Sequence, residues 1–403
     1  MSKPLRVYTC TPAPFRGDHT FFARDSGLTC RGLQSLGVES RAIALRPAQP
    51  DDEPDLLRAS MAELESAAWW AGHHLDGVVL YAWGAGRYRK IAQAIRASGA
   101  KLYVHMDTGG LISPVVEWRH FLAGLSRAAQ GEYGPTVGWC RFVGSTLLAH
   151  SVGILWGDLR RVHHLRQADV VGAVSPIARQ RLKQYCRIWG GQALENRVQL
   201  CPAPVAPYLD YRGELKERQV IAVGRWGPSD AVKRPELLMQ TLAFVLAADP
   251  QVRAVIIGRD SERLGAQMRE WDVGWSERVT LTGVLRNAAV RNYYCQSRVS
   301  LCTSRSESAH IASAEAVCCG CSIVGPRSPF LPSLPYYVSR QSGTLADNET
   351  PEAISHAVLQ ELALWDAGRR DPVAISRAWC AELHADKVAR RILELMGLAP
   401  TVA

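Results

Sequence analysis

Two carboxylates, Glu307 and Glu315, lie eight positions apart in the segment SRSESAHIASAEAVCCGCSIVG. The pattern predicts the end of a strand, a loop, and then a helix that begins with small residues. A Glu in such a loop can accept hydrogen bonds from sugar hydroxyls while the free N–H groups of the first helical turn face a phosphate. The second Glu, two turns along, can reach a ribose diol. A lone pair of Glu residues at this spacing is more often solvated charge than chemistry, so the flanking residues must decide whether this is a sugar-nucleotide site.

Two cations precede this segment and suit the leaving group of such a donor. Arg225 follows the predicted strand VIAVG, so its side chain is expected at the carboxyl edge of a sheet, where doubly wound folds bind ligands. Lys233 follows in a loop that contains Gly227 and Pro228. A departing diphosphate needs cations and aimed N–H groups to stabilise its charge. Alone, an Arg at a strand end is more often a solvated charge.

The wider pattern resembles family 4 retaining glycosyltransferases. Similar segments are VIAVGRW at 220–226 with Lys233 and Arg234, AVIIG at 254–258, VTLTGVL at 279–285, and, in the first half, LRVYTCTPAP, YVHMD at 103–107 and ADVVGAVS at 168–175. The resemblance covers nearly the whole chain and is densest in its second half. The motif itself is carried, in order, by Ser304, Ser306, Glu307, Glu315, Ala316, Cys319, Gly320, Ile323 and Val324.

This resemblance implies a role for each candidate residue. Arg225 and Lys233 would bind the donor phosphates, Glu315 the ribose, and Glu307 the transferred sugar. Transfer would retain configuration without an enzymic nucleophile. The remaining donor contacts would come from Ser308, His310 and Ile311, and, in the first half of the chain, from His105 and Gly17.

The chain departs from the family pattern in two places. After the first Glu the family commonly has Gly-Phe-Gly, whereas this chain has Ser308, Ala309 and His310. Lost glycines disfavour positive φ, and His310 adds a titratable group. His310 either helps to select the sugar or points outward. Gly17 is followed by Asp18, where relatives often have a second glycine, which weakens its assignment to the donor phosphate.

The order of predicted elements indicates an α/β protein with two doubly wound Rossmann-like domains, facing across a cleft as in the GT-B fold that the resemblance implies. A Pro-rich segment at 202–212 is the predicted linker. We place the acceptor-side domain at 1–207 and the nucleotide-sugar domain at 208–379. An amphipathic helix at about 382–397, in a C-terminal segment 380–403, is expected to pack on the first domain. Within the first domain we predict one helix from about 54 to 70.

Composition bounds the remaining choices. With 403 residues, 47% hydrophobic and 21% charged, the chain is typical of a globular protein. Its 11 cysteines are expected to be reduced and buried. No DxD-like pair follows a strand, so neither a metal nor another cofactor is predicted. No signal region precedes the first strand, which predicts a cytoplasmic protein.

The longest nearly uncharged segment runs from Phe142 to Trp156 and is followed by Arg160, Arg161, His163, His164 and Arg166. Its 15 residues are too few to span a bilayer, so we expect a buried or interfacial helix. With the net charge of +9, this leaves open peripheral contact with the inner face of a membrane; a solvated face over a core is the simpler alternative.

Three functions follow, of which the first is favoured. It is retaining transfer of a hexose or hexosamine from a nucleoside-diphosphate sugar to a glycan, lipid or small acceptor. A nucleotide-sugar epimerase or a sugar phosphorylase would use a similar site. A basic protein that binds membranes or polyanions without catalysis is the third; nucleic acid is not an expected partner. The sequence does not identify the nucleobase, the sugar, the acceptor or the oligomeric state.

Overall fold

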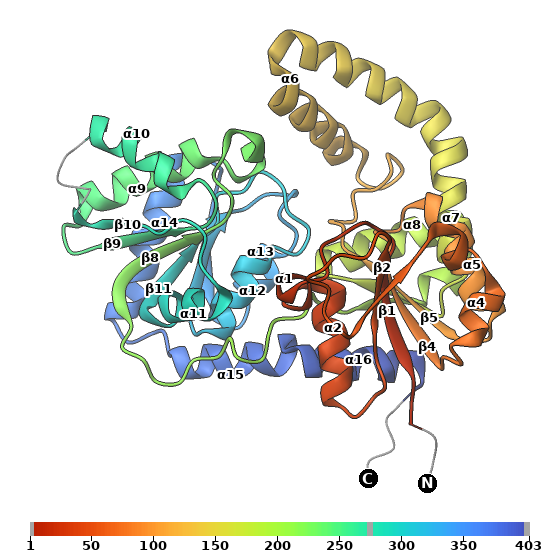
Figure 1. The fold of residues 1–403 in the computed structure, drawn as a ribbon. Coiled ribbons are helices and arrows are strands. Elements are labelled where there is room, and N and C mark those ends of the chain that lie inside the picture. Colours follow the sequence, from red (N-terminus) through yellow and green to blue (C-terminus); the bar gives the residue numbers. More distant parts are fainter. Residues whose placement is uncertain (1–3, 272–276, 399–403) are drawn as a thin grey trace. The chain divides into compact units, whose positions relative to one another are not determined.

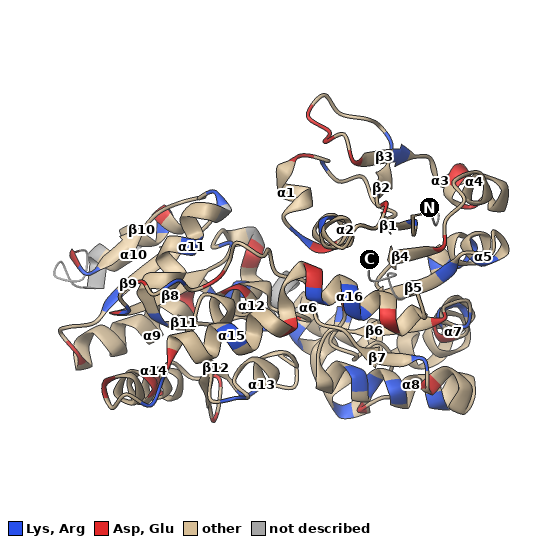
Figure 2. Ribbon diagram, turned by 90° about the horizontal axis from the view of Figure 1, so that it is seen from below, with Lys and Arg blue, Asp and Glu red and all other residues tan. Residues whose placement is uncertain are grey.

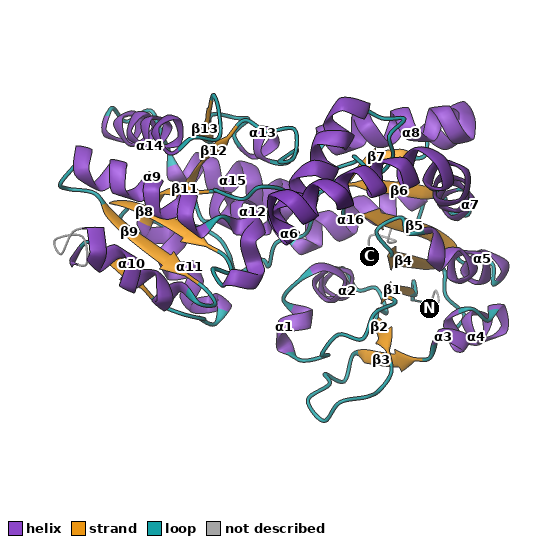
Figure 3. Cartoon of the chain, turned by 90° about the horizontal axis from the view of Figure 1, so that it is seen from above, coloured by secondary structure: helices purple, strands orange, loops and turns teal. Residues whose placement is uncertain are grey.

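The computed structural model describes residues 4–271 and 277–398 and has two compact units (Figure 1). Unit 1 comprises Met1–Ala206 together with Glu382–Ala403, and unit 2 comprises Pro207–Ala381. In each unit, helices cover both faces of a parallel sheet (Figure 3). The fold class predicted from the sequence, two doubly wound Rossmann-like domains, is confirmed.

Unit 1 contains a seven-stranded sheet of order β3-β2-β1-β4-β5-β6-β7, in which all pairs are parallel. Its apolar strands are buried on both faces, as in a sheet covered by helices on each side. The strands are β1 Val7–Thr11, β2 Ala42–Leu45, β3 Leu56–Ala59, β4 Gly77–Tyr81, β5 Lys101–Met106, β6 Val170–Ala173 and β7 Val198–Leu200. The helices are α1 His19–Phe22, α2 Asp25–Ser35, α3 Met61–Leu64, α4 Ala67–Gly72, η1 Gly86–Tyr88, α5 Arg89–Ala97, α6 Trp118–Leu148, η2 Ala149–Asp158, α7 Leu159–Leu165, α8 Pro176–Glu195 and α16 Ala385–Met396.

The amphipathic C-terminal helix α16 belongs to unit 1, where its apolar face joins the core. Val388, Ile392 and Met396 are buried with Leu33 of α2. The two helices lie so close at Gly32 that a Cβ there would be 2.2 Å from the Ala385 carbonyl oxygen. Only glycine therefore fits at this contact.

The helix predicted over 54–70 is wrong. The chain instead forms β3, whose Leu56 pairs with Ala42 of β2, followed by the short helices α3 and α4. Ser60 ends the strand and begins α3 through a capping box with Glu63. This cap separates the elements that the sequence analysis had joined.

The prediction for residues 142–156 also needs correction. They lie in a continuous helical segment of α6, η2 and α7, and Thr136–Leu165 is long and apolar enough to cross a membrane by length and composition. An 18-residue window of it is only 6% buried. The segment is therefore neither a buried helix nor one face over a core, and its length exceeds the 15 residues on which the prediction rested.

Unit 2 contains a six-stranded parallel sheet of order β10-β9-β8-β11-β12-β13. The strands are β8 Glu217–Val223, β9 Arg253–Ile257, β10 Val279–Leu281, β11 Ser297–Leu301, β12 Ser322–Pro326 and β13 Gly343–Ala346. The helices are η3 Pro228–Lys233, α9 Pro235–Ala248, η4 Ser261–Arg263, α10 Leu264–Trp271, α11 Asn287–Gln296, α12 Ile311–Cys318, α13 Leu334–Tyr337, α14 Pro351–Asp366 and α15 Pro372–Leu383. The last of these, α15, was not predicted.

Candidate active site at the β8–β11 switch point

The order of strands in unit 2 reverses at β8. The chain proceeds from β8 to β9 and β10 on one side, then returns to place β11 on the other side of β8. Doubly wound folds bind ligands at the carboxyl ends of the strands that flank such a reversal, because the two connections diverge there and leave a crevice. The loops after β8 and β11 carry Lys233 and Glu307, which the sequence predicted as site residues.

Lys233 and Glu307 form an ion pair at this point, although 74 positions separate them. The Lys233 Nζ lies 2.5 Å from Glu307 Oε1, and their side chains are 16% and 21% exposed. An ammonium group has three N–H donors, and this bond uses one. Lys233 thus carries both a fixed orientation and unused donor capacity for an anion.

Arg234 fastens the same two loops together. Its Nε donates to the Thr303 carbonyl at 2.7 Å, its Nη2 donates to the Ser304 carbonyl at 3.0 Å, and its Nη1 pairs with Glu349 at 2.7 Å. Thr303 Oγ1 in turn donates to the Lys233 carbonyl at 3.0 Å. Arg234 is therefore a positioning residue that holds Lys233 and Glu307 in reach of one another.

Glu307 is held in its ionised form. Burial alone would raise its pKa, but the protonated form of His310, and Lys233 through its charge and its hydrogen bond, lower the pKa below the ordinary value. Burial, with repulsion from Lys233, lowers the pKa of His310 to about 4. His310 is consequently neutral at neutral pH, and Lys233 is the cation that sustains the carboxylate there.

His310 points inward, so the outward alternative is wrong. Its side chain is buried, and Nδ1 lies 2.6 Å from Ser313 Oγ. The residue precedes α12 with φ +45°, the left-handed conformation that glycine adopts most easily. His310 thus adopts positive φ where the altered loop had suggested that this was disfavoured, and His is among the non-glycine residues that tolerate it best.

Glu315 lies on α12 near the Tyr294 hydroxyl, which donates to Glu315 Oε2 at 3.3 Å. Ile311 is the first residue of that helix and Ser308 belongs to the loop before it. Arg225 follows β8 by two positions, is 58% exposed, and has its Nε 3.0 Å from Asp230 Oδ1. The predicted donor-binding residues of unit 2 therefore lie around one switch point; their roles remain predictions.

Unit 1 has a pocket of about 400 Å³ at its own switch point, between β1 and β4. Its walls combine aromatic rings, two arginines and two carboxylates. Asp25 begins α2 with φ +44°. Its pKa is raised, mainly by burial and to a smaller extent by the negative charge of the nearby Asp107. The pocket is lined by Thr11, Phe15, Arg16, Thr20, Phe21, Arg24, Asp25, Ser26, Tyr81, Trp83 and Asp107.

Neither predicted site residue of unit 1 is among those lining residues. His105 is buried in β5, 4.4 Å from the Tyr81 ring between centroids, and burial lowers its pKa to about 4. Its Nδ1 has no hydrogen-bond partner within the described part of the chain. A Cβ at Gly17 would meet Leu56 Cδ2 at 2.0 Å, so packing accounts for this glycine. Their roles toward a donor remain predictions.

Sequence reasoning missed Arg234 as the fastening residue and missed Asp25 and Trp83 of the pocket. One signal in the sequence could have located Arg234. It directly precedes Pro235, and because proline favours the first position of a helix, Arg234 is expected at the start of α9. Asp25 and Trp83 gave no comparable signal, because their positive φ depends on tertiary packing.

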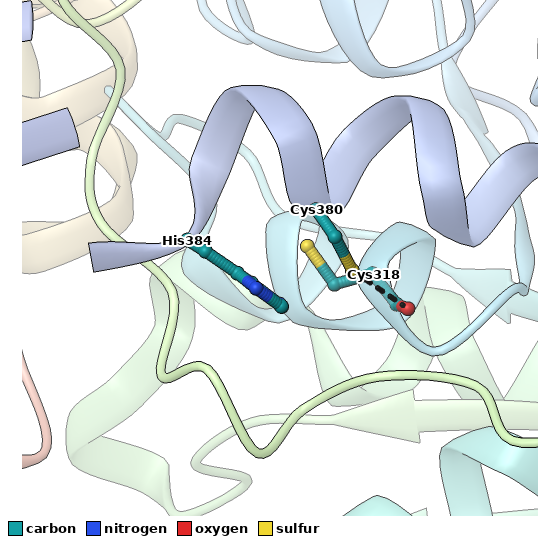
Figure 4. A group of neighbouring side chains, drawn as sticks. All are labelled: Cys318, Cys380 and His384. Carbon is teal, nitrogen blue, oxygen red and sulfur yellow. Dashed lines mark hydrogen bonds between the residues drawn. The ribbon is translucent and has the colours of Figure 1, made fainter. Parts of the chain in front are cut away.

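The expectation of reduced, buried cysteines is confirmed for nine of them and wrong for Cys140, which is exposed; Cys380 is intermediate. In Figure 4 the Cys380 side chain approaches α12, and its Sγ donates to the Cys318 carbonyl at 3.5 Å. Burial raises the pKa of Cys318 well above the ordinary value. The Cys318 thiol is therefore a protonated packing group.

Residues 217–363 match the family model described as glycosyl transferases group 1. Unit 2 is a group 1 glycosyltransferase domain. No curated protein gives a significant match to the chain. The matched residues include Arg225, Lys233, Glu307 and Glu315, so the group 1 domain contains the candidate donor residues of unit 2.

Solved structures show the same fold over the whole chain. Sucrose-phosphate synthase from Thermosynechococcus elongatus is 16% identical, with a TM-score of 0.62 over 97% of this chain and 98% of its own. HepE from Anabaena in complex with UDP is 13% identical, with a TM-score of 0.64 over 98% and 100%. The lipopolysaccharide outer core galactosyltransferase WaaB is 14% identical, with a TM-score of 0.60 over 98% and 99%. The GT-B fold assignment follows from these likenesses.

Proposed function

We propose that the chain transfers a hexose or hexosamine from a nucleoside-diphosphate sugar to an acceptor with retention of configuration. The observation that carries this proposal is the Lys233–Glu307 pair at the β8–β11 switch point. A cation and an ionised carboxylate side by side match a substrate that presents a diphosphate next to sugar hydroxyls. HepE was solved with UDP and with UDP-glucose, which supports a donor of this class.

Each polar group has a distinct task in this proposal. The free donors of Lys233 and the guanidinium of Arg225 stabilise the charge that develops on the departing diphosphate. Glu307 accepts from hydroxyls of the transferred sugar, and Glu315 accepts from the ribose. The acceptor binds in the pocket of unit 1, whose rings suit the apolar face of a sugar and whose carboxylates suit its hydroxyls.

No metal enters this scheme, because Lys233 and Arg225 supply the positive charge. The experiment is ¹H NMR of slow donor hydrolysis by the purified chain, with UDP-, GDP- and ADP-sugars and with EDTA present. We expect one donor class to lose its sugar as the retained anomer before mutarotation, and Glu307→Gln to abolish this signal.

Other outcomes distinguish the alternatives. Release of the inverted anomer contradicts retention. Conversion of the donor to its epimer, or turnover only with inorganic phosphate, indicates the epimerase or phosphorylase instead. Loss of activity with EDTA that Mg²⁺ restores contradicts the metal-independent scheme.

A further inference from the structure

A long helical excursion leaves unit 1 and returns to it (Figure 1). We call residues 118–157 the arm; they comprise α6 and nearly all of η2. The arm starts after Glu117 and ends at Asp158, and each of these two acids is paired inside unit 1. We call Glu117 and Asp158 the feet of the arm.

Both feet are attached to α8. Arg181 of α8 contacts both carboxylate oxygens of Glu117, at 2.8 and 3.1 Å, and is itself 4% exposed. Asp158 is 3% exposed and accepts from Ser113 at 2.5 Å, from Arg161 at 2.7 Å and from the Tyr185 hydroxyl at 3.3 Å. Arg181 and Tyr185 are four residues apart, so one face of α8 secures both ends.

Between these feet, large apolar side chains are open to solvent. Their exposed fractions exceed one half, which is unusual for a helix in a globular protein, where one stripe is normally buried. Patches larger than a few hundred Å² of this kind mark interaction surfaces. The residues and their exposures are Val137 55%, Trp139 61%, Leu147 68%, Leu148 65%, Val152 52%, Leu155 62% and Trp156 62%.

The charge on and beside the arm is positive. The arm's sequence has Arg119, Arg127 and Arg141 against the single acid Glu132. Arg119 and Arg160 stack over Trp118 and Trp156 at 5.4 and 5.6 Å. Lys and Arg also gather along α8, the helix that holds the feet (Figure 2). An apolar surface flanked by cations is complementary to anionic lipid headgroups over hydrocarbon.

We propose that the arm docks unit 1 onto an anionic lipid surface and lies within its interface. Because both feet are attached to one helix of the same unit, a membrane-crossing arm would have to cross twice. Two passes need about 40 apolar residues and a connection between them, whereas the arm has 40 residues in all, three of them arginines, and is continuously helical. A symmetric contact between two copies would oppose like charges. The lipid interface accommodates both the apolar and the cationic side chains.

The test is flotation of the full chain with vesicles of phosphatidylcholine alone or mixed with phosphatidylglycerol. We expect binding to the anionic vesicles that weakens at least tenfold at high salt, and a similar loss in the triple variant Trp139→Ser, Leu147→Ser, Leu148→Ser. The matched control replaces three exposed apolar residues of unit 2, Leu215→Ser, Val284→Ser and Val373→Ser, which are 83%, 75% and 47% exposed. It should float like the unaltered chain.

Cys140 provides a second readout within the arm, because it is the one exposed cysteine among the residues that the structure describes. An environment-sensitive fluorophore on Cys140 should brighten with anionic vesicles and stay unchanged with phosphatidylcholine. Equal binding to both vesicle types would overturn the role of charge. Absence of vesicle binding, with self-association that the triple variant abolishes, would overturn the proposal in favour of a second copy of the chain.

Discussion

Lys233 Nζ and Glu307 Oε1 lie 2.5 Å apart where the order of strands in unit 2 reverses. The two residues come from loops after neighbouring strands, and Arg234 binds the carbonyls of one loop from the other. The pair is partly shielded from water, so its geometry is more than a surface ion pair. This arrangement presents a cation and a carboxylate together, ready for a substrate that has both phosphate and hydroxyl groups.

Replacing Lys233 with Ala should weaken binding of the nucleoside diphosphate by about 10- to 100-fold, as expected for loss of a charge-assisted bond worth roughly 1.5–3 kcal/mol. Titration calorimetry measures the change. Arg212→Ala is the control, because Arg212 is a cation of unit 2 that is also paired with an acid, Asp210, but is exposed and lies outside the candidate site. Equal affinities of Lys233→Ala and the unaltered chain would contradict the assignment.

Arg234→Met should lower both donor affinity and stability, since it releases the Thr303 and Ser304 carbonyls and leaves Glu349 without its arginine. Removing one partner of a partly buried ion pair lowers the protein's free energy of unfolding by about 3 kcal/mol. Urea unfolding monitored by circular dichroism gives this value. A variant that keeps full stability and affinity would show that Arg234 does not position the loops.

At position 310, glycine should give a more stable protein than alanine, the reverse of the usual order within a helix. At φ +45° a Cβ is strained, so His310→Gly should be more stable than His310→Ala by about 1 kcal/mol. The control is Ala353→Gly in α14, where glycine should instead cost about 1 kcal/mol. Urea unfolding of the three variants decides the matter, and a more stable His310→Ala would argue against the left-handed conformation.

The chain should lose stability as the pH falls from about 6.5 to 4. Burial lowers the pKa values of His105, His164 and His310 to about 4. Between about pH 6.5 and 4, therefore, these histidines bind protons in the unfolded chain but stay neutral in the folded chain, which favours unfolding. The contribution of each is on the order of 1–3 kcal/mol. Urea unfolding at several pH values should show that the free energy of unfolding depends less steeply on pH for His105→Gln than for the unaltered chain. An unchanged slope would contradict the buried, neutral state of His105.

Most of the fold was readable from the sequence because alternating β-rich and amphipathic segments specify parallel strands with crossover helices. The amphipathic C-terminal helix, expected at about 382–397, is α16 Ala385–Met396. The strand Leu56–Ala59 was not readable, since its pairing with β2 is a tertiary contact and the Ser60 cap that ends it lies inside an apparently helical stretch.

The site was readable in its residue types but not in its connections. Glu307 and Lys233 could be assigned separately, yet nothing local predicts that they meet across 74 positions. The arm gave a partial signal, because its apolar composition was visible while its exposure depends on the absence of packing partners within the described part of unit 1. A contact of high sequence separation accounts for the first failure, and the lack of tertiary packing on the arm accounts for the second.

The most direct test of the account is a thermal-shift panel of the full chain with UDP, GDP, ADP and their sugars, each with Mg²⁺ or EDTA. A ligand at one hundred times its dissociation constant stabilises the folded state by about 2.7 kcal/mol. We predict that one nucleotide raises the melting temperature, that EDTA leaves the shift intact, and that Glu315→Ala removes it while Glu236→Ala, an exposed Glu on α9, does not. No shift with any nucleotide in folded protein would contradict a donor site at the Lys233–Glu307 pair.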